Sequence, residues 1–190
     1  MKTMNTHHLV LGTLTDFLSG AEITDTHDER YRQKIARILV LEKGFAPSDI
    51  RAGTRLRVSA SGKCATIPVD FLVHVEERAM MLIKYGPGSI ITRHRPALAA
   101  SRLMAPHQIP VVIVTNGEQA DILSGLTGRV TASGLDAIPD KEAVEKLAME
   151  PPQAISPGRA ERESRILFAF DVDGSCPCDS DICRMDHHES

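Results

Sequence analysis

The sequence predicts an α/β domain in which helices cover both faces of a mixed central β-sheet. Amphipathic stretches of helical period alternate along the chain with short, β-branched apolar runs, and the expected order of elements is α-β-β-β-α-β-α-α. One of these runs, Pro-Val-Val-Ile-Val-Thr over residues 110–115, is apolar at successive positions. Such a strand is typical of the middle of a sheet that is covered on both sides.

The first helix is predicted over residues 28–43, because apolar residues recur there at helical spacing and Gly44 supplies a stop. Thr26 is a suitable N-cap, and Glu29 three residues later would complete a capping box. The other elements are expected as strands over 55–59, 67–75, 79–85 and 110–115, and helices over 96–104, 140–149 and 159–170.

The composition fits a single globular domain: 190 residues, of which 42% are hydrophobic and 25% charged. A formal net charge of −3 argues against a protein that coats nucleic acid through bulk positive charge. No apolar run approaches the ~18 residues of a membrane helix, and the first residues lack a secretory pattern. We therefore expect a cytoplasmic protein without a membrane partner.

The domain is expected over residues 1–170, with a core at about 26–130 and a helical extension over 135–170. Residues 171–190 form an acidic tail that contains cysteine and histidine, with six acidic residues against one arginine. Cys64 is isolated and the other three cysteines lie in this tail, so they cannot form a disulfide framework across the fold.

Two successive strands predict a hairpin centred on Glu77, in which Asp70 faces Lys84 and Leu72 faces Leu82. Period-two alternation places Asp70 and Lys84 on one face of this hairpin. The opposite, apolar face is expected to consist of Val69, Phe71, Val73, Val75, Met81 and Ile83. An acid and an amine that share a face form either a cross-strand ion pair or part of a site.

These residues resemble a known family. Pro68-Val69-Asp70, an apolar strand that ends in Lys84 and a preceding helix that bears Glu29 are similar to the PD-(D/E)xK restriction-endonuclease-like superfamily. Residues 29–117 resemble the N-terminal domain of the type I restriction enzyme R subunit, including Arg-Gln-Lys-Ile-Ala-Arg-Ile-Leu-Val-Leu-Glu-Lys-Gly and Val-Val-Ile-Val-Thr-Asn-Gly. The resemblance implies that residues 1–170 have a restriction-endonuclease-like fold.

In that family, the Asp and the middle acid of the motif hold a divalent metal, and the Lys positions or activates the attacking water. The resemblance matches Asp70 to the Asp and Lys84 to the Lys, but Leu82 stands in place of the middle acid. Because Mg²⁺ requires oxygen ligands, we expect a degenerate nuclease-like domain that binds nucleic acid or another phosphate-bearing partner. The alternative is an active Mg²⁺-dependent DNA endonuclease in which Glu29 joins Asp70 as a metal ligand, instead of serving as a helix cap.

A basic segment, Arg93-His94-Arg95, follows the predicted site closely in the sequence. Two guanidinium groups and an imidazole suit a phosphate or another anion. The segment is therefore a candidate phosphate-binding site, and its alternative is a solvated helix start.

The acidic tail offers a third interpretation, a non-enzymatic metal-binding or protein-interaction module. Cys176, Cys178 and Cys183, with His187 or His188, provide enough ligands for a tetrahedral Zn²⁺ site, although the same segment could be unstructured. The partners that the sequence leaves open are nucleic acid, a second copy of the chain, and the other subunits of a restriction-type complex.

Overall fold

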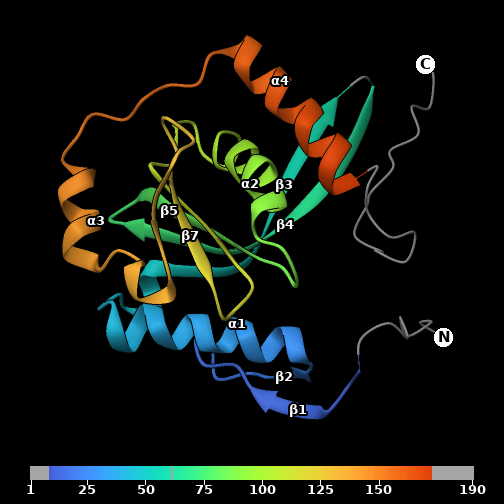
Figure 1. The fold of residues 1–190 in the computed structure, drawn as a ribbon, viewed down its shortest axis with the longest axis vertical. Helices are drawn as coiled ribbons and strands as arrows, with labels where there is room; N and C mark the ends of the chain where they lie inside the picture. The colour runs from blue at the N-terminus through green and yellow to red at the C-terminus, as the bar shows by residue number, and fades with distance from the viewer. Residues whose placement is uncertain (1–8, 61, 173–190) are drawn as a thin grey trace.

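The computed structural model describes residues 9–60 and 62–172, and six of its strands form one mixed sheet (Figure 1). The strands are β1 (Gly12–Thr15), β2 (Glu22–Asp25), β3 (Ile50–Ala60), β4 (Lys63–Val75), β5 (Arg78–Tyr85), β6 (Val111–Thr115), β7 (Ala120–Ser124) and β8 (Val130–Ser133). Strands β3 to β8 follow one another in space in chain order, and β1 pairs with β2 in a separate hairpin. Neighbouring strands are antiparallel except β5 and β6, which are parallel and joined through α2.

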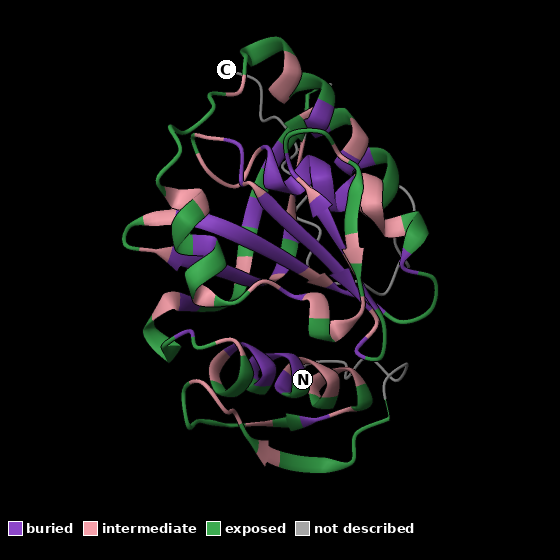
Figure 2. Cartoon of the chain, turned by 60° about the vertical axis from the view of Figure 1, so that its left-hand side comes forward, coloured by how far each residue is buried: buried purple, intermediate pink, exposed green. Residues whose placement is uncertain are grey.

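The helices are α1 (His27–Arg37), α2 (His94–Ser101), α3 (Lys141–Ala148) and α4 (Pro157–Leu167). Two apolar clusters lie on the sheet. One contains Ile35 of α1 and Val144 of α3, and the other contains Leu98 of α2 and Leu167 of α4. Figure 2 accordingly shows buried strands between partly exposed helices. The predicted fold class, a mixed sheet with helices on both faces, is confirmed.

The first helix begins and ends where its local sequence predicts. The Oγ1 of Thr26 accepts a hydrogen bond from the backbone N–H of Glu29 at 3.1 Å, which satisfies one free donor of the first turn. A wider π turn over Ile38–Glu42 continues the helix. Gly44 then takes a φ of 77°, a conformation that an L side chain rarely adopts, and ends it.

The β4–β5 hairpin has the predicted pairing of Leu72 with Leu82, but its inward faces differ from the prediction. Phe71 packs in the cluster beneath α1, whereas Val69 packs in the cluster beneath α2 and α4. The inward side of β4 therefore changes at Asp70. Opposite this point in β3, Gly53 has a φ of 61°. Simple alternation assumes a regular strand, so it placed Val69 on the wrong face.

Four strands, β1, β2, β7 and β8, were not predicted. Each has only four or five residues, and β1, β2 and β8 are largely exposed, which removes the apolar alternation that marks a strand. The observed order is consequently β-β-α-β-β-β-α-β-β-β-α-α. Across the described ranges, no helix combines the length and apolar character needed to span a lipid bilayer.

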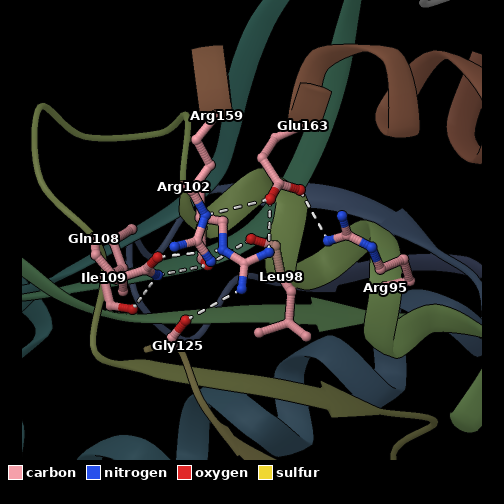
Figure 3. A network of polar contacts seen from close by, with 9 residues as sticks. Arg95, Leu98, Arg102, Gln108, Ile109, Gly125, Arg159 and Glu163 are labelled. Atoms are coloured by element: carbon pink, nitrogen blue, oxygen red, sulfur yellow. Dashed lines mark hydrogen bonds and ion pairs between the residues drawn. The ribbon is translucent and has the colours of Figure 1, made fainter. Parts of the chain in front are cut away.

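A network of ionic contacts joins α4 to α2 (Figure 3). The Glu163 carboxylate accepts hydrogen bonds from Arg95 and Arg102, each at 2.8 Å. Arg159 Nε lies 3.6 Å from the same carboxylate. Arg102 also reaches Gln108 on the segment that leads into β6. One carboxylate on α4 is thus shared by three guanidinium groups, two of them at α2 and one on α4 itself.

The buried ring of His74 predicts a dependence of stability on pH. It lies where the β4–β5 register shifts, and its Nδ1 has no hydrogen-bond partner. Burial lowers the pKa of His74 below its ordinary value of 6.5, and Arg51 lowers it further. The unfolded chain therefore binds a proton at this residue more readily than the folded protein.

We expect the free energy of unfolding to be independent of His74 protonation above pH 6.5. Below pH 6.5, the free energy of unfolding should fall, because the unfolded chain takes up a proton at His74 before the folded protein does. The free energy of unfolding, measured with urea between pH 7 and pH 5, should fall less steeply in His74→Gln than in the wild-type protein. An equal slope in the two proteins would contradict this assignment.

Candidate functional site

Asp70 lies at the point where β4 changes its inward side, and both oxygens of its carboxylate are engaged. Oδ1 accepts a hydrogen bond from Nε of Arg32 at 2.7 Å, and Oδ2 accepts one from the backbone N–H of Tyr85 at 2.7 Å. Only 9% of the Asp70 side chain is exposed. The carboxylate therefore ties β4 to α1 and to the end of β5.

Lys84 has a different partner. Its Nζ lies 2.5 Å from Oδ2 of Asp171, and the Lys84 side chain is 14% exposed. Asp171 belongs to the turn that follows α4, which packs on the opposite side of the sheet from α1. The expected convergence of Asp70 and Lys84 is not observed. The change of face at Asp70 directs its carboxylate toward α1, whereas Lys84 meets the turn after α4.

The position of the missing middle acid is part of the core. Leu82 is fully buried and packs in the same cluster as Leu98 of α2 and Leu167 of α4. Its apolar side chain is therefore a packing element of the fold rather than a surface substitution beside the site.

Glu29 lies on the side of the sheet that Asp70 faces. Its Oε1 accepts a hydrogen bond from Nε2 of Gln33 at 2.8 Å, and its Oε2 lies 3.6 Å from Nη1 of Arg32. Glu29 and Asp70 thus contact the same guanidinium group. The backbone N–H of Glu29 makes the capping bond to Thr26, so the residue contributes both to the helix start and to this charged cluster.

Two tyrosines complete the cluster around α1. The rings of Tyr31 and Tyr85 stack with their centroids 5.9 Å apart. The hydroxyl of Tyr85 donates to Asp28 at 2.9 Å, and that of Tyr31 donates to Glu118 at 3.0 Å. Burial raises the pKa of the Tyr85 phenol, and its hydrogen bond to Asp28 raises it further. Both phenols therefore act as neutral hydrogen-bond donors at neutral pH.

The β6–β7 turn approaches α1 so closely that it requires glycine. A β-carbon on Gly117 would lie 2.1 Å from the Tyr31 ring, and the φ of Gly117 is 87°. Lys34 also donates to the backbone carbonyl of Gly117 at 2.8 Å. The Thr-Asn-Gly segment, which belongs to the stretch that resembles the R subunit domain, thus fixes α1 against one end of the sheet.

The candidate phosphate-binding residues all have partners within the fold. Arg93 donates to the carbonyl of Pro87 at 3.0 Å, and Nε2 of His94 lies 2.8 Å from Oδ2 of Asp121. Arg95 belongs to the network around Glu163. The structure therefore spreads these three side chains among three partners and does not gather them into one anion site.

Arg32 was not predicted as the partner of Asp70, nor Asp171 as the partner of Lys84. Arg32 stands three residues after Glu29, a spacing that places two side chains on one face of a helix, so this neighbour could have been found. Asp171 lies 87 positions from Lys84, and no local pattern connects them.

A family model for the type I restriction enzyme R protein N terminus matches residues 27–139. The chain belongs to this family. The match begins at α1 and includes β3 to β8, whereas α3 and α4 follow it in the chain. Comparisons with curated proteins and with solved structures found no match.

The superfamily resemblance implies a divalent metal, but the described residues do not fit one. Leu82 offers no oxygen ligand, and the Asp70 oxygens are bonded to Arg32 and to the backbone of Tyr85. Within residues 9–60 and 62–172, no three His, Cys, Asp or Glu side chains are grouped so that they could hold a metal ion. The predicted zinc ligands Cys176, Cys178, Cys183, His187 and His188 lie outside the described residues.

Proposed function

We propose that this member of the type I restriction enzyme R N-terminal family binds duplex DNA without metal-dependent cleavage. The observation that carries the proposal is the burial of Leu82 in the apolar core. An acid at this position supplies a metal ligand in the resembled motif, and leucine cannot do so. The distinct partners of Asp70 and Lys84 support the same conclusion.

An exposed basic stripe on β3 supports the binding part of the proposal. Arg55 and Arg57 are exposed and stand two residues apart, so they share a face of the strand. Leu56 and Val58, which alternate with the two arginines along the strand, are buried in the cluster that includes Leu167 of α4. The two arginines therefore lie on the opposite face of β3. Guanidinium groups along an exposed strand suit the phosphates of a DNA backbone, which contribute affinity but little sequence information.

The binding proposal is tested by fluorescence anisotropy with a labelled 30-base-pair duplex over a range of salt concentrations. The double variant Arg55→Gln/Arg57→Gln should bind more weakly and should reduce the slope of log K against log salt by about 2. The matched control is Arg162→Gln/Arg165→Gln, which removes the same charge from exposed positions on α4. Equal losses in the two variants would contradict a specific role for β3.

The cleavage part of the proposal is tested with the same duplex in Mg²⁺ or Mn²⁺. We expect no cleavage above the rate of a metal-free control. One observation favours the alternative, an active endonuclease, because Glu29 and Asp70 lie close enough to contact one guanidinium. Robust cleavage that is abolished by both Asp70→Ala and Glu29→Ala would establish that alternative and overturn the proposal.

A further inference from the structure

A guanidinium group occupies the space between the two carboxylates that the endonuclease alternative would use as metal ligands. Nε of Arg32 lies 2.7 Å from Oδ1 of Asp70, and its Nη1 lies 3.6 Å from Oε2 of Glu29. Glu29 belongs to α1 and Asp70 to β4, so the ion pairs of Arg32 link this helix to this strand. A guanidinium held between two carboxylates compensates one of their two negative charges, a part of what a divalent metal would compensate.

The position of this guanidinium is fixed by its other neighbours. Its central carbon lies 5.2 Å from the centroid of the Tyr85 ring, a cation–π distance. The Tyr85 ring is in turn held by Tyr31 and by the hydrogen bond to Asp28. The Arg32 side chain remains 36% exposed, whereas Asp70 beneath it is almost completely buried. Arg32 therefore covers the buried acid from the solvent side.

The neighbouring carboxylates favour the charged form of Arg32. Burial by itself lowers the pKa of the Arg32 guanidinium, but Asp70, with its hydrogen bond, and Glu29 outweigh this effect and raise the pKa above its ordinary value. The guanidinium is therefore charged at neutral pH. In contrast to a bound metal, this cation cannot dissociate or be removed by a chelator.

We infer that Arg32 is a built-in cation that takes the place of a divalent metal between Glu29 and Asp70. This inference rests on the proposed loss of metal-dependent cleavage and explains how the fold tolerates the remaining acids. It has a direct consequence for the wild-type protein, whose stability should not depend on divalent metal. Removal of the guanidinium charge should create such a dependence.

The test compares melting temperatures in EDTA and in 5 mM MnCl₂ for the wild-type protein and for Arg32→Met, which keeps much of the apolar stem. In EDTA, Arg32→Met should melt about 5–10 °C lower than the wild-type protein, because Asp70 is left buried without a counter-ion. Mn²⁺ should recover at least half of this loss by binding the folded state. The wild-type protein should not respond to Mn²⁺.

Arg30→Met is the matched control. It removes the same charge from α1, where Arg30 pairs with Asp25 instead, and it should not respond to Mn²⁺. Addition of Glu29→Gln to Arg32→Met should abolish the response. An Arg32→Met protein that is insensitive to Mn²⁺, or a wild-type protein that is stabilised as strongly as the variant, would overturn the inference.

If Arg32→Met does not fold in EDTA, the double variant Arg32→Met/Asp70→Asn decides the matter. It removes both charges, so it should fold without metal, and its failure to fold would overturn charge compensation as the role of Arg32. None of these measurements uses DNA. Their outcome is therefore separate from that of the binding and cleavage assays that test the proposed function.

Discussion

Replacement of Glu163 with glutamine is expected to lower the free energy of unfolding by about 3–5 kcal/mol. Its carboxylate is only 4% exposed and accepts hydrogen bonds from Arg95 and Arg102. The Arg102 side chain is itself buried, and the variant would leave its charge without a counter-ion. The loss should exceed that of an ordinary hydrogen bond, because a buried unpaired charge carries a large desolvation cost.

Urea denaturation of the wild-type protein and the variant measures this effect. Glu161→Gln is the matched control on the same helix, since Glu161 is 64% exposed and pairs with Arg165 at the surface. It should change the free energy of unfolding by no more than about 0.5 kcal/mol. Similar losses in the two variants would show that the buried network is no more important than a surface ion pair.

Leu82→Glu is expected to destabilise the protein by about 4 kcal/mol or more, although it restores the acid of the resembled motif. Leu82 is fully buried among apolar side chains, and the charged motif residue two positions along the strand, Lys84, is already paired with Asp171. A carboxyl group at position 82 would have to be buried in apolar surroundings, and packing would be lost. We therefore expect neither cleavage nor metal binding to return with this single change.

The measurement is again urea denaturation, with Leu82→Met as the control for side-chain shape. A change from leucine to methionine nearly conserves volume and should cost less than about 1.5 kcal/mol. A Leu82→Glu protein as stable as the wild type would mean that the position can open to solvent, and it would remove the main support for a non-cleaving domain.

The sequence predicts well those features that depend on neighbouring residues. Apolar spacing and the N-cap at Thr26 are local properties of α1. The predicted β4–β5 register holds at Leu72 and Leu82 but not next to the turn, where Val75 pairs with Arg78 because the register shifts between Val73 and His74. The core strand β6 is evident because every residue in it is apolar or β-branched. Helix and strand positions around the site were therefore predictable.

The site itself was less predictable because its contacts are distant in the chain. Asp70 and Arg32 are 38 positions apart, and periodicity within β4 carries no information about the helix that covers it. The change of face at Asp70 coincides with Gly53 on the neighbouring strand. A pattern read along a single strand cannot contain that information, so the prediction that Asp70 and Lys84 share one face was wrong.

The contact between Glu163 and Arg102 has a consequence for the order of events during synthesis. Arg102 lies inside the stretch that matches the family, and Glu163 lies 24 residues beyond its end at residue 139. When the nascent chain has emerged only as far as residue 139, Arg102 has left the ribosome but its counter-ion Glu163 has not. We therefore expect the sheet to reach its final packing only after α4 has left the ribosome.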